Sequence, residues 1–492
     1  MVVNSFNFLI FLLVVLFVYY SPLSKKYKGF QNMWLFLTSY IFYGVANWKT
    51  IPLLLSVTIV FYAIGLWLKS EIAKGASKRA SQITTLGVLL GLGVLFYFKY
   101  LNFFADSFAS LFRGIGFNVS WTTINVVLPI GVSFFTFKLI SYVIEIHREH
   151  MEPCKDFVKF AAYVAFFPTI LSGPIDRPNK FIPQMGGGRD LDYSLAVSGL
   201  RQILWGLFLK MCVADRLCSY TDFILNDPGA NNGTSLLIAG LLYPMQMYAD
   251  FAGYSEMAIG VGRLLGFNVT PNFDYPYLKT NIPSFWRGWH MSLTSWLTDY
   301  VFMPLNIKLR NMGWIGSEIA IIVTFTFCGL WHGANWTFVI WGLYHGLLFL
   351  PSMATGSFFK KKKAKVGLWG LPKLYDMMKM VKVYLLVAFG LIIFRATSLG
   401  EAFTVFERIL FNQDVYAIKY GYMGRWYFLY TFILMLIVVF KDIKDVYLYQ
   451  RIKLMENSKK HIRWATYYIL CSMIIWYGIN SSADGSFIYF NF

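Results

Sequence analysis

Long apolar runs separated by short polar or basic segments repeat along the whole chain. A helix needs about 20 mostly apolar residues to cross a bilayer. Thirteen stretches meet that rule: 5–22, 31–48, 51–68, 83–102, 123–144, 157–174, 195–216, 234–252, 316–331, 334–352, 380–396, 426–441 and 463–481. The pattern predicts an all-α polytopic membrane protein with about 11–13 membrane segments, some of them re-entrant.

The composition supports a membrane protein over a soluble one. Hydrophobic residues make up 57% and charged residues 14% of the 492 positions, against about 45–50% and about 25% in soluble domains. The net charge of +19 lies in short clusters between apolar runs, which is typical of cytoplasmic loops facing anionic lipid and excludes a nucleic-acid partner. The first apolar run lacks a cleavage-site pattern, so we expect a retained helix.

The basic clusters predict the orientation, because Lys and Arg concentrate in cytoplasmic loops. They lie at 25–28, 69–79, 360–365 and 441–463, and both ends of the chain are then outside. We find no fixed-period repeat and no long soluble segment. We therefore treat 1–492 as one transmembrane domain, with N-terminal helices (1–122), a core that carries the polar motifs (123–352) and C-terminal helices (353–492).

The apolar stretch "FCGLWHGANW" (327–336) contains a histidine between two glycines. Gly329 and Gly333 predict an interruption of the helix, and irregular backbone at membrane depth is tolerated only inside protein or beside a cavity. The break therefore predicts a cavity that contains His332. A neutral imidazole there is suited to act as a general base, and a hydrogen-bonded structural histidine is the alternative. Its expected neighbours are Trp331 and Trp336 as walls and Asn335 as a partner of a ring nitrogen.

Two further polar features interrupt apolar sequence. In "MQMYADFAGYSEMA" (245–258), Gln246, Asp250 and Glu256 lie in a run too apolar to leave them facing lipid. They predict a polar tunnel lining, or else an Asp that pairs with an Arg or caps a helix. The three prolines of 166–181 predict a loop or re-entrant turn around Arg177, which either binds an anion or anchors the turn.

The stretch "FWRGWHMSLTSWLTDY" (285–300) is typical of an interfacial helix on the cytoplasmic side, with His290 and Arg287 on it. His345, within "WGLYHGLLF", is expected to be structural. The five cysteines have no metal spacing and the histidines are not grouped with acids, so no metal site is predicted. The expected aromatic anchors of the interfacial helix are Trp286, Trp289 and Trp296.

Two functional classes remain open from the residues alone. One is an enzyme acting on a group that passes through the membrane, and the other is a transporter that uses buried Asp and His as a proton relay. A transporter favours paired broken helices in two related halves, and only one marked break is visible, at 329–335. A membrane scaffold does not account for the buried polar residues.

Several motifs resemble, in order along the chain, those of the membrane-bound O-acyltransferase family, in its alginate O-acetyltransferase-like branch. The matching stretches are "LPIGVSFFTFKLISYVIEIHR" (128–148), "AFFPTILSGPIDRP" (165–178), "YADFAGYSEMAIGVGRLLGF" (248–267), "FDYPYLKTNIPSFWRGWHMSLTSWLTDYVFMPL" (273–305), "TFCGLWHGANWTFVIWGLYHG" (326–346) and "FIYFNF" (487–492).

The resemblance implies a ring of helices around a central funnel, with a tunnel through a thin partition. It implies an acyl-CoA donor, acetyl-CoA above all, at the cytoplasmic side of a bacterial inner membrane. The acyl group would pass to an exported polysaccharide, usually through a separate extracytoplasmic acetyltransferase partner. The invariant family histidine matches His332, and the cytoplasmic-side histidine matches His290. Lining positions by this interpretation are Gln246, Asp250, Trp286, Arg287, Trp289, Trp331 and Asn335.

Two departures from the family pattern fall on the expected donor side. Gly288 follows Arg287 where the family often has a second basic residue, and "PLNIKLRN" (304–311) stands where many members have Gly-Gly-Asn-Arg. These differences leave open the related D-alanyl transferase branch, in which a carrier protein is the donor and teichoic acid the acceptor. By the resemblance, His332 takes the proton of the accepting hydroxyl, while His290 positions the thioester or relays the acyl group.

Overall fold

The computed structural model describes residues 3–27, 29–117, 119, 128–355, 371–421, 424–448 and 458–479. Within these ranges the chain is almost entirely helical and contains no β-strand, which confirms the predicted all-α class. The basic cluster 360–365 and the C-terminal segment 481–492, both used in the predicted orientation, lie outside the described residues.

Seven stretches of the described chain are long and apolar enough to cross a membrane. The sequence predicts about 11–13 segments by the length rule alone. Part of the difference arises because α1 (Phe6–Tyr19) and α7 (Val132–His147) have only 14 and 16 residues. The predicted spans 31–48 and 51–68 fall in one stretch, and the predicted spans 234–252 and 463–481 are not among the seven. The predicted span 157–174 is wrong, since α8 (Phe157–Val164) ends before the proline-rich turn. The seven stretches are 30–73, 77–114, 193–225, 310–332, 336–354, 374–395 and 424–447.

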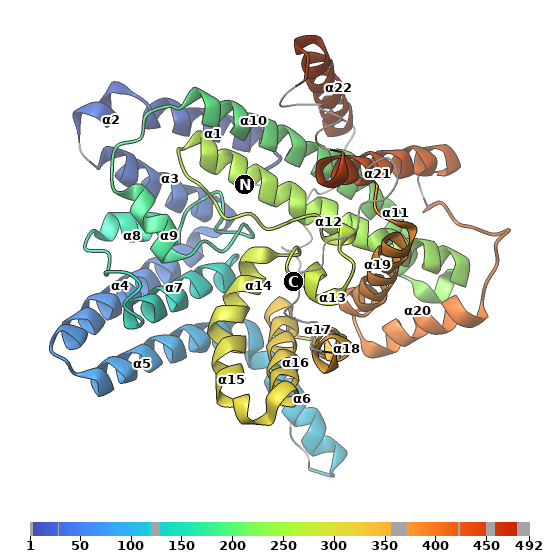
Figure 1. Ribbon diagram of the computed structural model, residues 1–492, viewed down its shortest axis with the longest axis horizontal. Coiled ribbons are helices and arrows are strands. Elements are labelled where there is room, and N and C mark those ends of the chain that lie inside the picture. Colours follow the sequence, from blue (N-terminus) through green and yellow to red (C-terminus); the bar gives the residue numbers. More distant parts are fainter. Residues whose placement is uncertain are drawn as a thin grey trace. The chain divides into compact units, whose positions relative to one another are not determined.

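Contacts divide the chain into two compact units, of which the first comprises 1–203 and 258–270. In it α4 (Ile51–Ala73), α5 (Ser77–Leu95) and α7 lie side by side (Figure 1). A Cβ atom on Gly91 of α5 would lie 2.7 Å from Ile140 of α7, so glycine permits this close approach. This unit also contains α2 (Pro22–Lys26), α3 (Phe30–Asn47), α6 (Leu101–Gly114), α9 (Pro178–Phe181) and the start of α10 (Tyr193–Leu207).

The proline-rich segment of the first unit is a buried turn, as predicted. Asp176 at its centre accepts hydrogen bonds from the backbone N–H and the hydroxyl of Thr270, at 2.9 and 2.8 Å. Lys138 is 1% exposed and donates to the Thr169 hydroxyl at 3.1 Å. Arg177 is only 9% exposed. Polar side chains thus hold a segment whose prolines cannot continue a helix.

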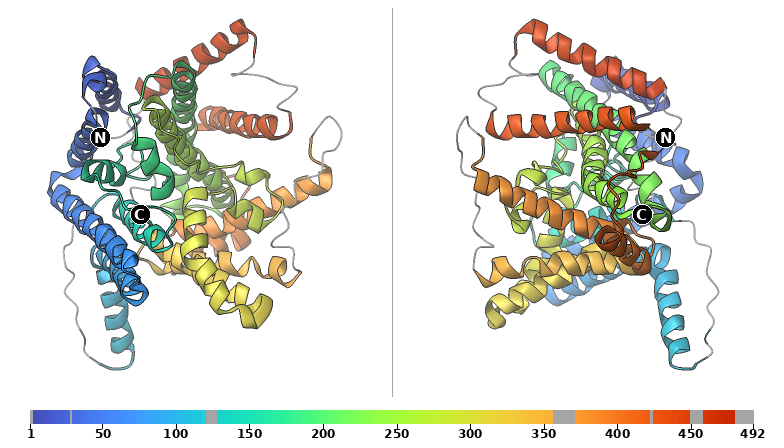
Figure 2. Two further views of the ribbon diagram at one scale, coloured as in Figure 1. Left: turned by 60° about the vertical axis from the view of Figure 1, so that its left-hand side comes forward. Right: turned by 90° about the vertical axis from the view of Figure 1, so that its right-hand side faces the viewer.

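The second unit comprises 204–257 and 271–492 and contains the two predicted catalytic histidines. Figure 2 shows its helices in two further views. They are α11 (Asp215–Leu225), most of α12 (Gly233–Leu264), α13 (Ile282–Trp286), α14 (Met291–Leu297), α15 (Met303–Lys308), α16 (Gly313–His332), α17 (Trp336–Leu347), α18 (Leu350–Ala354), α19 (Leu374–Arg395), α20 (Leu399–Phe411), α21 (Gly424–Tyr447) and α22 (Lys460–Ile479).

Helices α16 and α17 form a closely packed hairpin around glycines. A Cβ atom on Gly329 would lie 2.1 Å from the carbonyl oxygen of Phe338. One on Gly342 would lie 2.2 Å from the carbonyl oxygen of Phe325. These glycines let two backbones touch, as small residues do in membrane helix pairs. Gly329 therefore does not interrupt α16, contrary to the prediction; it serves packing.

The segment 285–300 is not one interfacial helix, so that prediction is wrong. The chain forms α13, turns at 287–290 and begins again as α14. The three tryptophans expected at the lipid interface are at most 5% exposed, and they pack inside the unit: Trp286, Trp289 and Trp296. The break comes at His290, which takes a left-handed backbone with φ 45° and ψ 52° and so cannot continue a helix.

Candidate active site

His332 is the last residue of α16, and the helix break falls where the sequence predicts it. Gly333 follows in extended conformation, and α17 begins at Trp336. The side chain of His332 is 5% exposed. A Cβ atom on Gly333 would lie 2.0 Å from the Phe338 ring, so the turn needs a glycine for space. The break therefore holds an imidazole inside the unit at the end of an apolar helix.

Aromatic rings surround His332. The centroid of its imidazole lies 4.8 Å from that of Trp331, 5.3 Å from that of Trp341 and 5.2 Å from that of Phe394. All three pairs are edge-to-face, the geometry that aromatic quadrupoles favour. Trp331 contacts the imidazole, as expected of a neighbouring ring. Trp336, the other expected wall, is instead 53% exposed.

A third histidine, His345, extends this cluster. Its ring centroid is 5.0 Å from those of Trp341 and Trp286. The rings of Trp286, Trp341 and His345 each carry a buried nitrogen that has no hydrogen-bond partner among the described residues: Nε1 of Trp286, Nε1 of Trp341 and Nδ1 of His345. Buried polar atoms of this kind are normally satisfied. Three of them in adjoining rings mark a place prepared for a polar group.

His290 contacts the same cluster through Trp331. It is 1% exposed, and its ring centroid lies 5.9 Å from that of Trp331 and 4.6 Å from that of Phe251. It lies outside the seven apolar stretches. Burial lowers the pKa of His290 to about 3, because a charged imidazole would lose its hydration. The Trp331 indole thus contacts both histidines, and the His290 imidazole is neutral at physiological pH.

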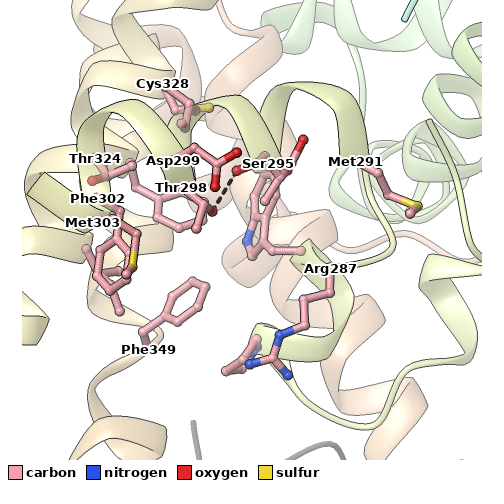
Figure 3. A pocket seen from close by; sticks show the side chains of 16 residues that line it. Arg287, Met291, Ser295, Thr298, Asp299, Phe302, Met303, Thr324, Cys328 and Phe349 are labelled. Atoms are coloured by element: carbon pink, nitrogen blue, oxygen red, sulfur yellow. Dashed lines mark hydrogen bonds between the residues drawn. The ribbon is translucent and has the colours of Figure 1, made fainter. Parts of the chain in front are cut away.

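A cavity of about 440 Å³ lies between α14 and α16 (Figure 3); we call it the α14–α16 cavity. Its volume is in the range of small-molecule sites. Trp286 lines it and joins it to the histidine cluster, and the exposed side chains of Arg287 and Asp299 also line it. Its apolar walls come mostly from Met291, Phe302, Met303, Ile321, Phe325, Cys328 and Phe349.

Hydroxyl groups line one side of the cavity and already donate to backbone. The Thr294 hydroxyl donates to the carbonyl of His290 at 3.1 Å, that of Ser295 to Ser292 at 3.1 Å, and that of Thr298 to Thr294 at 2.7 Å. Each keeps free capacity as an acceptor. This wall is therefore suited to bind N–H groups.

Asp250 and Gln246 of α12 are buried but are engaged by other side chains. Lys210 donates to Asp250 at 2.6 Å and lies 2.9 Å from Asp215, while the hydroxyl of Thr221 donates to Gln246. Asp250 is thus paired, as one of the two predicted alternatives requires, but its partner is a lysine and not the predicted arginine. Lys210 lies in a π-helical segment, 208–214, a feature frequent at functional sites.

The remaining predicted residues lie around the cluster. Trp289 stacks on Phe285 at 5.6 Å and does not line the cavity. Asn335 caps α17 through the N–H of Thr337 and donates to the carbonyl of Thr397. Its amide oxygen and nitrogen both bind backbone, so the predicted bond to a histidine ring is not the one observed.

Gly288, the departure from the family pattern, has a structural reason. A Cβ atom there would lie 2.7 Å from the carbonyl oxygen of Asp274, and the Gly288 carbonyl accepts from the N–H of Asp274. A second arginine would force these two backbone segments apart. Arg287 is therefore the only basic side chain that the cavity lining contains.

The fold and the site together define a multi-pass helical membrane protein with buried histidines beside a cavity. The model of the membrane-bound O-acyltransferase family matches residues 40–370. The chain belongs to this family and is an O-acyltransferase. Family membership thereby favours the enzyme over the transporter.

Named relatives come from several bacteria. "Probable alginate O-acetylase AlgI" of Azotobacter vinelandii is 35% identical over 84% of this chain and 79% of its own length. The peptidoglycan O-acetyltransferase of Helicobacter pylori is 28% identical over 99% of this chain and 97% of its own. The teichoic acid D-alanyltransferase of Bacillus subtilis is 31% identical over 55% of this chain and 69% of its own.

Proposed function

We propose that this enzyme transfers an acetyl group from acetyl-CoA for the O-acetylation of an exported or cell-surface polysaccharide. Relatives named for alginate and peptidoglycan acetylation support the reaction. The observation that carries the proposal is the position of His332, in an aromatic cluster that Trp286 joins to the α14–α16 cavity. The donor binds from the cytoplasmic side of a bacterial inner membrane, and its acetyl group is passed across that membrane. An extracytoplasmic acetyltransferase is the proposed partner.

His332 acts as the general base in this proposal. Its neutral imidazole takes the proton of the accepting hydroxyl, and the hydroxyl oxygen attacks the thioester carbonyl carbon. The carbon–sulfur bond breaks as the ester forms. The leaving thiolate receives the proton from the imidazolium, so acetyl thioester and alcohol become ester and thiol. His290, which also contacts Trp331, positions the thioester.

The cavity fits the donor arm chemically. Its hydroxyl oxygens match amide N–H groups, its apolar wall matches methylene groups, and the exposed Arg287 matches a phosphate. The buried nitrogen of Trp286 offers a donor to the thioester carbonyl oxygen, where negative charge develops.

The test is His332→Ala in permeabilised cells that lack their own copy of the gene and receive [14C]acetyl-CoA. We expect alkali-releasable label in the polysaccharide fraction to fall at least about 100-fold, the scale of a lost general base. His461→Ala, the same change at an exposed histidine of α22, is the matched control. A His332→Ala chain that inserts normally into the membrane and still labels the polysaccharide as strongly as the wild type would contradict the proposal.

D-alanyl transfer to teichoic acid is the second candidate, favoured by the 31% identity to the D-alanyltransferases. The donor is then a thioester on a carrier protein. The same alkali-released fraction distinguishes the two, because it contains D-alanine in one case and acetate in the other.

A further inference from the structure

The α14–α16 cavity has two unlike ends. Figure 3 shows Cys328 on the opposite side of the cavity from Arg287 and Phe349. Arg287 is exposed, whereas Cys328 is 3% exposed. The exposed Arg287 thus marks the open end of the cavity, and the buried Cys328 marks its closed inner end.

The inner end lies next to His332. Cys328 and His332 are four residues apart on α16, so they occupy the same face and their Cβ atoms are about 6 Å apart. Trp286 also lines the cavity, and its ring centroid is 4.9 Å from that of Phe325. A thioester arm that enters at Arg287 therefore brings its acyl end to Cys328 and Trp286.

The walls at the inner end cannot move apart. Phe325, Trp341 and His345 hold the Trp286 ring at centroid distances of 4.9, 5.8 and 5.0 Å. Behind Cys328, the backbone at Gly329 already touches α17. The mouth side, by contrast, includes the flexible side chains of Met291 and Met303. The size of the Cys328 side chain therefore affects how much room this closely packed end leaves for the acyl group.

We propose that Cys328 determines which acyl group the enzyme accepts, by closing the inner end of the α14–α16 cavity behind an acetyl group. The proposal rests on the proposed function, since it needs the acyl donor in this cavity. The ligand is an acyl thioester on a pantetheine arm, carried by CoA or by a carrier protein. One methylene in an apolar pocket is worth about 10–200-fold in selectivity.

The experiment compares [14C]acetyl-CoA and [14C]propionyl-CoA as donors in permeabilised deletion-strain cells carrying Cys328→Ala or Cys328→Val. We expect Cys328→Ala to raise the propionyl-to-acetyl ratio of kcat/KM about tenfold, because the freed space accommodates one methylene. Cys328→Val adds bulk and is expected to lower the ratio. Cys212→Ala removes another buried thiol of the same unit, away from the cavity, and is expected to leave the ratio unchanged.

Opposite changes of the ratio distinguish selectivity from a structural effect, which would lower transfer from both donors alike. If only one variant accumulates in the membrane, the sign of its ratio still decides. An unchanged ratio, or a change of the wrong sign, overturns the proposal.

Two further arms separate this inference from the proposed function. If acetyl-CoA gives no transfer in the wild type, acetylated and propionylated carrier protein replace the two donors, and the same ratio is measured. If His332→Ala transfers as well as the wild type, the proposed function fails. The Cys328 ratio then reports independently whether the cavity holds the acyl group.

Discussion

His290 combines a buried imidazole with a backbone conformation that suits glycine. Its φ of 45° lies in the left-handed region, which costs about 1–2 kcal/mol for an L-residue with a Cβ atom. The ring meanwhile contacts Phe251 and Trp331. A strained residue is retained where the surrounding structure determines it, often at a functional site.

This combination allows the backbone and the ring to be tested separately. His290→Ala and His290→Gly both remove the imidazole, but only glycine relieves the strain. We expect His290→Gly to unfold at a higher temperature than His290→Ala, with a free energy of unfolding about 1 kcal/mol larger. Both variants are expected to lose acyl transfer to the same extent. Thermal unfolding in detergent and [14C]acetyl transfer measure the two effects. Full activity in the glycine variant would show that the imidazole is dispensable.

Single residues were predictable from sequence only where their neighbours marked them. Two glycines and two tryptophans in an apolar run pointed to His332. His345 carried no such signal, since "WGLYHGLLF" is an uninterrupted helix, and its place beside Trp286 and Trp341 depends on the fold. The ion pair of Lys210 with Asp250 joins residues 40 positions apart, which no local pattern reveals.

At the scale of elements, the α16–α17 hairpin fixes the distance between His332 and the rings of α17. Gly342 and Gly346 form a small-residue motif on α17, with the Gly342 position against the backbone at Phe325 and Thr326. Such motifs let membrane helices pack at backbone contact. Any side chain at position 342 separates the helices and moves Trp341 relative to His332.

We expect Gly342→Ala to lower the unfolding temperature and to reduce acyl transfer at least about tenfold, because a small displacement at a catalytic group has large effects. Gly93→Ala is the control. It makes the same substitution in helix α5, where a Cβ atom meets nothing within 4 Å, and it is expected to behave as wild type. Equal behaviour of the two variants would contradict the role assigned to this packing.

Helix positions were largely predictable from apolar length, and helix ends were not. The sequence predicts a span over 157–174, but the chain leaves the helix at Val164 because the turn is held by Asp176 and Lys138. The tryptophans of 285–300 match an interfacial pattern, yet they are buried. Aromatic side chains favour both environments, so sequence alone cannot distinguish a lipid interface from an aromatic core.

At the scale of the molecule, the distribution of Lys and Arg predicts the sidedness of the enzyme. The loop after α4 is basic and should face the cytoplasm, while the segment between α20 and α21 should face outward. Lys74 and Tyr416 are well-exposed positions in these loops, with side-chain exposure of 62% for Lys74 and overall exposure of 99% for Tyr416.

The measurement is labelling of Lys74→Cys and Tyr416→Cys with a membrane-impermeant maleimide, in a chain whose exposed Cys471 is replaced by alanine. In spheroplasts we expect Tyr416→Cys to react and Lys74→Cys to react only after lysis. Reaction of both before lysis would contradict the predicted topology, and with it the cytoplasmic donor.

The rings around His332 also have a consequence for the cell. If the proposed acetyl transfer takes place across a membrane that stores energy as a proton gradient, that membrane must not leak during transfer. Trp331, Trp341 and Phe394 pack edge-to-face against the imidazole, and Trp331 also contacts His290. We expect this packing to keep ions and protons from crossing the membrane beside the imidazole. Loosening it with smaller side chains should therefore depolarise the membrane even where acetylation survives.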